Sequence, residues 1–442
     1  MRASLRRFIP KSLFGVYHGM LADLATWRYG RPAREMTIIG VTGTSGKTTV
    51  SLMLHAILER AGHPTAVATT ALFAIRDTQR VNDRKMTMLG RFALQKFLRR
   101  AQTAGCTYAI VETTSEGLAQ NRHRGLDYDV AVLTNLTPEH IESHGSFAAY
   151  RQAKERLFHV LTLTARKPRV KKSIIVNADD ESAPIFLRHA ADDYYTFSLT
   201  KRSIGTASPV QALDIELSPS GSSFTLEYAG RGERVHLKLL GRMNVENAMA
   251  AATTAIALGI PIGAIAEGLV SVESVPGRME SITAGGVTVV VDYAFHPKAM
   301  EELYAVVEQL PHRRVIHVLG ATGGGRDRAR RPVLGRMASE RADIVIVTNE
   351  DPYDEDPYAI MDEVKAGVME IGGRAEDRNV FTIFDRRAAI GKAVLLAGKG
   401  DLILVTGKGS EQAIVVANGK RVPWDDRTAV RSALEEKFGK SD

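Results

Sequence analysis

A glycine-rich segment near the N-terminus contains the residue types that bind phosphate groups. Residues 40–49 read Gly-Val-Thr-Gly-Thr-Ser-Gly-Lys-Thr-Thr and lie between a β-branched run and a stretch with helical spacing. In such a loop, glycines let backbone N–H groups approach an anion, the helix start adds its dipole, a lysine reaches the outer phosphates and a threonine ligates Mg²⁺. Val41 departs from the strict Walker spacing, which has a glycine there. We expect the nucleotide to contact Gly43, Thr44, Ser45, Gly46, Lys47, Thr48 and Thr49.

Polar residues end several apolar runs farther along the chain. The runs at 108–112, 130–135 and 173–177 are rich in Val, Ile and Ala, which is the pattern of buried parallel strands. Ligands of open α/β sheets bind at the carboxyl ends of such strands. Glu112 and Asn135 end two of these runs, so they are candidates for one site.

The alternation of strand-like and helix-like segments indicates an α/β fold in two units. A Pro-Gly pair at 276–277 breaks the chain between an Ala-rich helical stretch and a new strand. We predict a short basic N-terminal helical segment over 1–35 and a central P-loop-type parallel-sheet domain that binds ATP over 36–275. A smaller, Rossmann-like α/β domain is predicted over 276–442.

The composition is that of a folded globular protein. The 442 residues are 44% hydrophobic and 24% charged, and 58 Lys and Arg against 50 Asp and Glu give a net charge of +8. These values exclude wholesale disorder, and so modest an excess suits a nucleotide without indicating nucleic acid. The single cysteine, Cys106, excludes an intrachain disulfide and a Cys-rich metal site, so we expect a cytoplasmic location.

The first 35 residues are more basic than the rest, with seven Lys and Arg against two acids. Apolar residues recur there at spacings of three and four, which predicts one apolar helix face: Leu13, Tyr17, Met20, Leu24 and Trp27. Charged residues interrupt the stretch too often for it to span a membrane. Two alternatives stay open: residues 1–30 contact a membrane surface peripherally, or the helix docks on its own protein.

Further motifs follow the glycine-rich loop in order along the chain. Thr-Asn-Leu-Thr-Pro-Glu-His stands at 134–140, Tyr-Arg-Gln-Ala-Lys-Glu-Arg-Leu-Phe at 150–158, Gly-Arg-Met-Glu at 277–280 and Gly-Lys-Gly-Ser-Glu at 407–411. Together these motifs resemble the Mur ligase family, the ATP-dependent amide-bond-forming enzymes of cell-wall peptide assembly, with their folylpolyglutamate synthase relatives. The set is most similar to the branch that adds the third stem residue to UDP-N-acetylmuramoyl-dipeptide.

The resemblance implies an ATP-dependent ligase that joins a carboxylate, such as a muramoyl-peptide, to an amino acid through an acyl-phosphate in peptidoglycan precursor synthesis. Such a reaction depends on positioning and on neutralising charge. By the same resemblance, the catalytic residues are Lys47, Glu112, His140 and Lys154. Thr48 and Glu112 would hold one Mg²⁺, and Glu112, His140 and a carbamylated Lys154 a second. Judged without the resemblance, Lys154 would be a cation on a helix surface that pairs with a neighbouring acid.

The resemblance also assigns residues to each substrate. The expected ATP contacts are Asn244, Asn247, Arg278 and Asp292. The asparagines could otherwise cap a helix, and the Arg and Asp could form an interdomain salt bridge. The expected contacts of the acyl substrate are Thr87, Thr114, Gln120 and Arg122. The expected contacts of the incoming amino acid are Arg326, Asp351, Tyr353, Gly407 and Glu411. The charged members of this set could instead be solvated surface residues.

The sequence departs from the family pattern in two places. Related ligases have a uridine-binding domain before the nucleotide loop, and the roughly 40 residues here leave no room for it, so we expect uridine to be recognised differently. Tyr353 stands where ligases selective for diaminopimelate have an arginine. Because a tyrosine cannot make a two-pronged contact to a second carboxylate, we expect weaker selection for diaminopimelate, with lysine admissible.

Two other functions stay open at this point. A folylpolyglutamate-type or other amino-acid-polymer ligase would share the ATPase core, and a non-catalytic scaffold would bind nucleotide without turnover. The presence of Lys47, Glu112, His140 and Lys154 argues against the scaffold.

Overall fold

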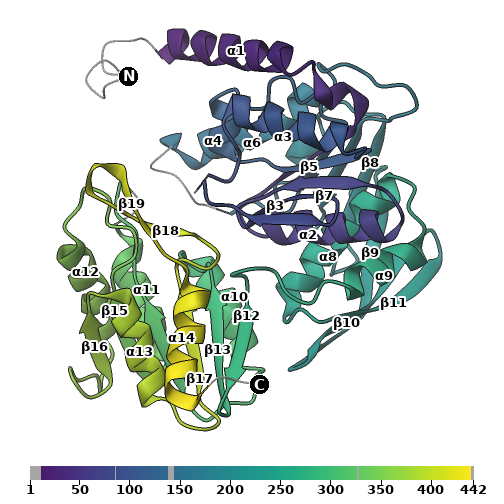
Figure 1. Cartoon of the computed structure of the whole chain (residues 1–442). Coiled ribbons are helices and arrows are strands. Elements are labelled where there is room, and N and C mark those ends of the chain that lie inside the picture. The colour runs from purple at the N-terminus through teal and green to yellow at the C-terminus, as the bar shows by residue number, and fades with distance from the viewer. Residues whose placement is uncertain (1–10, 85, 138–143, 326–327, 440–442) are drawn as a thin grey trace.

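The computed structural model describes residues 11–84, 86–137, 144–325 and 328–439, which form two α/β lobes (Figure 1). The larger lobe is built on an eleven-stranded sheet and the smaller C-terminal lobe on a six-stranded sheet. A hairpin of β18 (Ala413–Val416) and β19 (Lys420–Pro423) belongs to the smaller lobe. The predicted α/β class, with a large central sheet and a second C-terminal one, is confirmed.

The larger sheet is parallel at its centre and antiparallel at both edges. Its strands lie in the order β11 (Arg231–Leu237), β10 (Gly221–Tyr228), β9 (Ser208–Ser218), β8 (Asp193–Ser198), β7 (Ser173–Asn177), β6 (Val130–Leu133), β1 (Thr37–Thr42), β5 (Tyr108–Glu112), β2 (Thr65–Ala68), β3 (Leu72–Ile75) and β4 (Thr78–Val81). Strand β1 pairs with β5, where Val41 lies opposite Glu112, and with β6 on its other side. The carboxyl ends of all three strands therefore meet around the loop that follows β1.

Helices cover both faces of this sheet because its central strands are apolar on both sides. Ile38 and Ile39 are consecutive in β1, so they point to opposite faces and belong to separate buried cores. One core is closed by α2 (Lys47–Arg60), α8 (Arg242–Ala257) and α9 (Ile262–Val270). The other is closed by α3 (Arg91–Thr103), α4 (Ser115–Ala119), α6 (Phe147–Leu161) and α7 (Ala183–Phe186).

The smaller sheet is parallel except at β12, which pairs antiparallel with β13. Its order is β12 (Glu280–Ala284), β13 (Val287–Asp292), β17 (Leu402–Thr406), β14 (Val315–Leu319), β15 (Ile344–Thr348) and β16 (Val380–Ile383). One face packs against α10 (Pro297–Val307), α11 (Arg330–Arg341) and α12 (Pro357–Met369). The opposite face packs against α13 (Arg386–Leu396) and α14 (Asp426–Phe438).

Helix α1 (Lys11–Arg28) packs on α3 through small residues. Its buried positions are Gly19, Ala22, Ala25 and Thr26. Its large apolar side chains point away from the protein and are 52%, 67%, 50% and 71% exposed at Tyr17, Met20, Leu24 and Trp27. The helix therefore docks on its own protein, as one alternative has it, but it leaves its apolar face uncovered. Within the described residues, no helix has both the length and the apolar character needed to cross a membrane.

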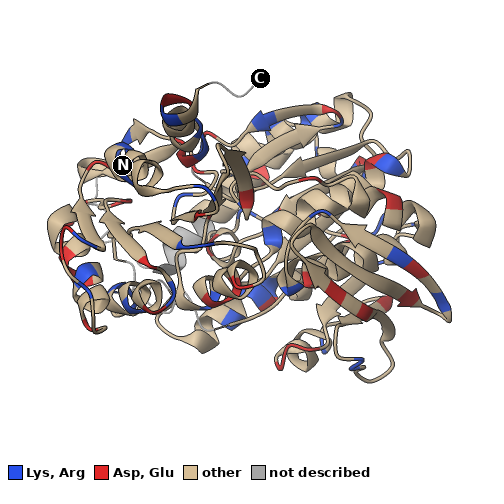
Figure 2. Cartoon of the chain, turned by 90° about the horizontal axis from the view of Figure 1, so that it is seen from below, with Lys and Arg blue, Asp and Glu red and all other residues tan. Residues whose placement is uncertain are grey.

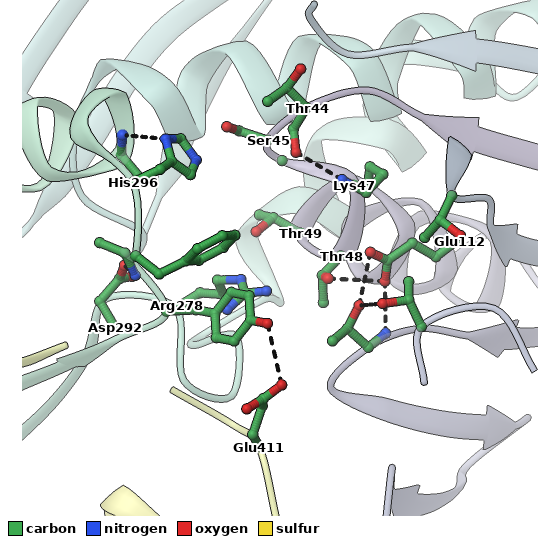
Figure 3. Close-up of a pocket in the computed structure, with 18 of the residues that line it drawn as sticks. Thr44, Ser45, Lys47, Thr48, Thr49, Glu112, Arg278, Asp292, His296 and Glu411 are labelled. Atoms are coloured by element: carbon green, nitrogen blue, oxygen red, sulfur yellow. Dashed lines mark hydrogen bonds between the residues drawn. The ribbon is translucent and has the colours of Figure 1, made fainter. Parts of the chain in front are cut away.

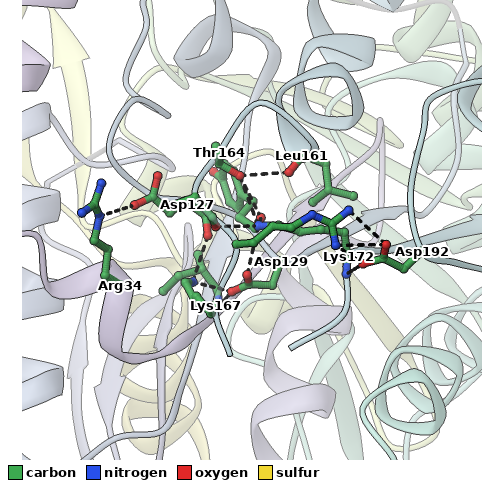
Figure 4. A network of polar contacts seen from close by, with 12 residues as sticks. Arg34, Asp127, Asp129, Leu161, Thr164, Lys167, Lys172 and Asp192 are labelled. Carbon is green, nitrogen blue, oxygen red and sulfur yellow. Dashed lines mark hydrogen bonds and ion pairs between the residues drawn. The ribbon is translucent and has the colours of Figure 1, made fainter. Parts of the chain in front are cut away.

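A buried ion network ties together the amino ends of β1, β6 and β7, opposite the glycine-rich loop (Figure 4). Asp129 accepts the Ile38 N–H at 2.9 Å, the Lys172 ammonium at 3.1 Å and the Lys167 ammonium. Both lysines also donate to backbone carbonyls, including that of Met36. Burial lowers the pKa of Lys167, and the adjacent Asp129 opposes that shift. One carboxylate thus compensates two cations that lie out of water.

Replacing this carboxylate should cost much of the stability of the lobe. We expect Asp129→Ala to lower the free energy of unfolding by about 3–5 kcal/mol, because two buried ammonium groups lose their counter-charge. Urea unfolding followed by circular dichroism measures the change. The matched control is Glu267→Ala, which breaks an exposed pair with Arg60 and should cost less than about 1 kcal/mol. Equal losses in the two variants would contradict the role of Asp129.

Candidate active site

The loop between β1 and α2 has a backbone conformation that only glycine adopts without strain. Gly43 has φ 151° and Gly46 has φ 79°, in the region that L side chains avoid. Space imposes the same requirement, since a Cβ on Gly43 would overlap the Thr134 hydroxyl and one on Gly46 would overlap the Asn247 amide. Helix α2 then begins at Lys47, so its free N–H groups point at the loop. This is the geometry of a phosphate site.

Residues after β6 hold the loop in place. The Ser45 N–H donates to the Asn135 side chain at 2.9 Å, and the Thr44 N–H donates to the Asn135 carbonyl at 2.9 Å. The Thr134 hydroxyl donates to the Ser45 carbonyl at 2.6 Å. Asn135, which the sequence singled out as the polar end of a strand, therefore positions the loop through both its side chain and its backbone.

Two lysines donate to loop carbonyls. The Lys47 ammonium lies 2.9 Å from the Gly43 carbonyl and 2.8 Å from that of Thr44. Lys154 reaches the Gly43 carbonyl from α6 at 2.6 Å, and its ammonium lies 4.4 Å from the Tyr150 ring centre. Lys154 is buried, so the alternative of a surface cation is wrong. Helix α6 packs next to the loop, so the Lys154 side chain lies beneath the loop rather than in water.

Glu112 is the acid at the centre of the site. It is buried at the end of β5 and accepts the Thr48 hydroxyl at 2.9 Å and the Thr70 N–H at 2.7 Å. A carboxylate and a threonine hydroxyl beside a phosphate loop are the hard oxygen donors that Mg²⁺ takes together with phosphate oxygens and water. The predicted ligands Thr48 and Glu112 thus fit the ion. His140, the other predicted ligand, lies outside the described residues.

A cavity of about 430 Å³ lies between the lobes and contains most of the predicted site (Figure 3). From the larger lobe it is lined by the loop residues 44–49 and by Thr87, Glu112, Thr114, Arg122, Asn244 and Asn247. From the linker and the smaller lobe it is lined by Arg278, Asp292, Tyr353 and Glu411. Its size suits a ligand such as a nucleotide with part of a second substrate.

The other residues predicted to contact ATP, Asn244, Asn247, Arg278 and Asp292, line the same cavity as the loop. The Asn244 amide donates to the Leu240 carbonyl at 2.8 Å and accepts from Asn247 at 3.2 Å. Asp292 accepts the Met279 N–H at 2.8 Å and the Ala294 N–H at 2.7 Å, so it shapes the linker. Burial raises the pKa of Asp292.

Arg278 uses an aromatic ring as its neighbour in this part of the cavity. Its guanidinium lies 4.3 Å from the centre of the Tyr293 ring, a cation–π contact. Tyr293 in turn donates its hydroxyl to Glu411 at 3.2 Å. The three side chains form a chain across the smaller-lobe wall (Figure 3). Nothing in the sequence distinguishes Tyr293 from its neighbours, so no residue pattern selects it.

Of the predicted acyl-substrate contacts, Thr87, Thr114 and Arg122 line the larger-lobe wall of the cavity, and Gln120 does not. Thr114 caps α4 by accepting the Gly117 N–H at 3.0 Å. Arg122 donates to the Met88 carbonyl at 2.6 Å and to the Gln120 amide oxygen at 2.8 Å. Burial lowers the pKa of Arg122, with nearby Arg91 contributing. Gln120 therefore orients Arg122 from behind.

The smaller lobe arranges the predicted amino-acid contacts in two layers. Tyr353 and Glu411 line the cavity, whereas Asp351 lies behind them. Both oxygens of Asp351 lie 2.9 Å from the Lys408 ammonium, and one accepts the Val415 N–H at 2.7 Å. Asp351 thus holds the β18 segment in place. A Cβ on Gly407 would meet Glu350, which explains the glycine. Arg326 lies outside the described residues.

Comparisons with known proteins agree with this arrangement. Models of the Mur ligase middle domain and of the Mur ligase glutamate ligase domain match residues 41–255 and 277–409. The UDP-N-acetylmuramyl-tripeptide synthetase of Roseiflexus sp. (strain RS-1) is 39% identical over 424 residues, covering 94% of this chain and 82% of the relative. The UDP-N-acetylmuramoyl-L-alanyl-D-glutamate–2,6-diaminopimelate ligase of Geobacillus kaustophilus (strain HTA426) is 35% identical, covering 97% and 85%.

Solved structures show the same fold. A structure of a UDP-N-acetylmuramoyl-L-alanyl-D-glutamate–2,6-diaminopimelate ligase matches with TM-score 0.60 at 31% identity over 91% of this chain and 79% of that one. A Mycobacterium tuberculosis folylpolyglutamate synthase matches with TM-score 0.69 at 18% identity over 98% and 100%, which is a likeness of fold alone.

The fold and the inter-lobe site define an ATP-dependent ligase that forms amide bonds. The chain belongs to the Mur ligase family. The family and the enzyme class that the motifs predicted are thereby confirmed.

Two acids that no sequence pattern indicates, Glu246 and Glu302, lie close enough for their charges to interact, and Glu302 lines the cavity. Burial raises the pKa of Glu246 to about 7, and nearby Glu302 adds to the shift. Glu246 lies on α8 and accepts the Asn177 amide at 3.0 Å, and Glu302 lines the cavity from α10. Burial raises the pKa of Glu302 as well. Neither acid stands at a strand end or within a phosphate motif, so no local signal marked it.

The raised pKa of Glu246 predicts a specific pH dependence of stability. The folded state holds this proton more tightly than the unfolded state, so stability is fully present below about pH 4.5 and is lost as the pH rises to about 7. Between pH 5 and pH 8, we expect the free energy of unfolding to fall by on the order of 2 kcal/mol less in Glu246→Gln than in the wild type. Urea unfolding at both pH values measures it. A wild-type slope retained in the variant would contradict the assignment.

Proposed function

We propose that this ligase joins an amino acid to the peptide carboxylate of UDP-N-acetylmuramoyl-dipeptide. One observation carries the proposal: a single cavity is lined by a phosphate loop with Glu112, by Arg122 with two threonines on the larger lobe, and by Tyr353 with Glu411 on the smaller lobe. The reaction needs one set of residues to bind a phosphoryl donor, one to bind an acid and one to bind an amine. The three groups of lining residues supply these sets. The two relatives named for reactions of this kind are 39% and 35% identical to the chain over the aligned residues.

The chemistry has two balanced steps. An oxygen of the substrate carboxylate attacks the γ-phosphorus of ATP, and the bond to the bridging oxygen breaks, which gives an acyl phosphate and ADP. The amine then attacks the acyl carbon, phosphate leaves with the electrons of the C–O bond, and the proton lost by the nitrogen passes to the departing phosphate. Lys47 and the loop N–H groups hold the phosphates, and Arg122 faces the acid. Closure of the two lobes would exclude water from the acyl phosphate.

The metal-binding groups follow from the same geometry. Thr48 and Glu112 would hold Mg²⁺, which neutralises charge that builds up between the phosphates and the carboxylate. Lys154, carbamylated and acting with Glu112 and His140, would hold a second ion. The burial of Lys154 beside the loop supports this, because a buried amine next to a metal site is useful as an oxygen ligand only after it gains a carbamate.

The smaller-lobe wall bears on the choice of amine. Tyr353 has φ 52°, and its ring packs on Gly324, where a Cβ would lie 2.7 Å from ring atoms. A phenol fixed in this way offers one hydroxyl and no positive charge, so it cannot pair with a second carboxylate as a guanidinium does. Lysine is therefore an acceptable amine here, and selection for diaminopimelate is weak.

The exposed apolar face of helix α1 suggests that the enzyme contacts a membrane surface peripherally. Its uncovered apolar stripe, defined as Tyr17, Met20, Leu24 and Trp27, has an aromatic residue at each end. Arg28 and Arg31 are exposed next to it. Aromatic rings, an apolar face and flanking arginines are the composition of helices that lie on anionic lipid surfaces. We propose that this stripe contacts such a surface.

The amide-forming activity is tested with purified chain, Mg-ATP and UDP-N-acetylmuramoyl-dipeptide against a panel of amino acids. We expect phosphate release together with a product heavier by one amino acid residue, measured by mass spectrometry, and we expect lysine to react at least as fast as diaminopimelate. Bicarbonate-free buffer should slow turnover if Lys154 is carbamylated.

The control for this assay is Glu112→Gln, which keeps the shape of the side chain and removes its charge. Its turnover should fall by about 100-fold or more, because charge at the metal and phosphates is no longer balanced. No product with any amine while ATP is hydrolysed would contradict the acyl substrate. Exclusive use of diaminopimelate would contradict the assignment of Tyr353.

The membrane contact is tested by cosedimentation with vesicles of phosphatidylglycerol or of phosphatidylcholine. We expect binding to the anionic vesicles, and we expect the double variant Leu24→Ser/Trp27→Ser to lose about tenfold or more of it, since two large apolar groups no longer insert. Leu395→Ser is the matched control, because Leu395 is 68% exposed on the other lobe. Equal sedimentation of all three proteins would contradict the proposal, and a dimer that only the double variant loses would assign the stripe to a second copy.

A further inference from the structure

A second cavity, of about 820 Å³, lies in the larger lobe and is lined by residues of α3, of β3 and β4, and of the turn between those two strands. Its apolar lining includes Phe73, Leu89, Ala93 and Phe97. The two phenylalanine rings lie 6.1 Å apart between centres and are tilted by 52°. Both rings also pack into the lobe core, so the floor of the cavity is rigid. Its volume falls in the range of sites for nucleotide-sized ligands.

The rim of this cavity is strongly basic. Five cations line it, Arg76, Arg80, Arg84, Lys96 and Arg100, and the acid in the lining is Asp77. Arg80 and Arg84 share the neighbouring Asp83 at 3.3 and 3.5 Å. Elsewhere basic and acidic residues are interspersed along both lobes (Figure 2). This imbalance is therefore local, and it surrounds an apolar floor rather than open surface.

One stretch of chain separates this cavity from the active site. Asn82, Thr87 and Met88 line the inter-lobe cavity, whereas Arg84 and Leu89 line the second one. The stretch is anchored, because the Asn82 amide donates to the Thr69 carbonyl at 2.8 Å. The two cavities therefore lie on opposite sides of the segment that carries Thr87, a predicted contact of the acyl substrate.

We propose that the second cavity binds the diphosphate-bearing end of the acyl substrate, with the planar or apolar group attached to that diphosphate on the phenylalanine floor. An apolar floor inside a ring of arginines fits an organic diphosphate, because guanidinium groups bind phosphate oxygens in pairs and aromatic rings stack on bases. This inference rests on the proposed function, since it assumes an acid whose far end carries phosphates. A nucleoside diphosphate and a prenyl diphosphate share this chemistry.

The test is equilibrium binding to the full-length chain, without turnover, by isothermal titration calorimetry with UDP, uridine and geranyl diphosphate as probes. We expect UDP to bind, uridine to bind far more weakly, and added salt to weaken UDP binding. The double variant Lys96→Glu/Arg100→Glu should lose about tenfold or more of the UDP affinity and raise the KM of the acyl substrate, with kcat and the KM of ATP unchanged. Arg99→Glu is the matched control on α3, because Arg99 pairs with Gln102 and lies next to Gly30.

Each outcome decides the inference. Loss of UDP binding in the double variant alone supports a nucleoside diphosphate, and geranyl diphosphate bound in place of UDP with the same dependence on Lys96 and Arg100 supports a prenyl diphosphate. Binding of neither probe, or equal binding in all three proteins, overturns it. If the wild-type chain makes the tripeptide product and the double variant keeps the wild-type KM of the acyl substrate, this inference is overturned and the proposed function stands. If UDP binds as expected but no amide forms, the proposed function is contradicted and the diphosphate site stands.

Discussion

The conformation of the loop after β1 is the constraint on which the rest of the site depends. Gly43 and Gly46 have no room for a side chain, because Thr134 and Asn247 occupy the space that a Cβ would need. Thr134 directly follows β6 and Asn247 belongs to α8, so parts of the chain far apart in sequence close on the loop. The parallel pairing of β1 with β5 then sets Glu112 next to Thr48. Chemistry at this site is thus a consequence of how three strand ends and one helix pack.

The two lobes contribute unequal kinds of residue to the cavity. The larger lobe supplies backbone N–H groups, hydroxyls and one buried carboxylate, which suit phosphate and metal. The linker and smaller lobe supply Arg278, Tyr293 and Glu411, linked by a ring contact and a hydrogen bond. Behind them Asp351 and Lys408 form a buried pair that fixes the wall without reaching the cavity. The linker and smaller lobe therefore contribute charged side chains that are held in place by one another and by Tyr293.

Much of this arrangement could be predicted from residue patterns, and the reasons for the exceptions are physical. Glu112 and Asn135 could be found because polar residues at the ends of buried parallel strands lie where open α/β sheets bind ligands. Asp351 lies behind the cavity wall rather than in it, and sequence order cannot make that distinction. Lys154 is buried although helical spacing alone suggests a solvated cation, since burial depends on contacts between α6 and the loop. Glu246, Glu302 and Tyr293 depend on packing between distant elements and gave no local signal.

The edges of the eleven-stranded sheet have a consequence for how copies of this chain meet at high concentration. An edge strand exposes unpaired N–H and C=O groups, to which another strand can add. Here one edge is β4, which is short, exposed along its length and contains Arg80. The opposite edge, β11, carries Arg231, Glu233 and Arg234. Adding a strand to either edge would strip water from these charges, so the sheet is protected against edge-to-edge aggregation despite its width.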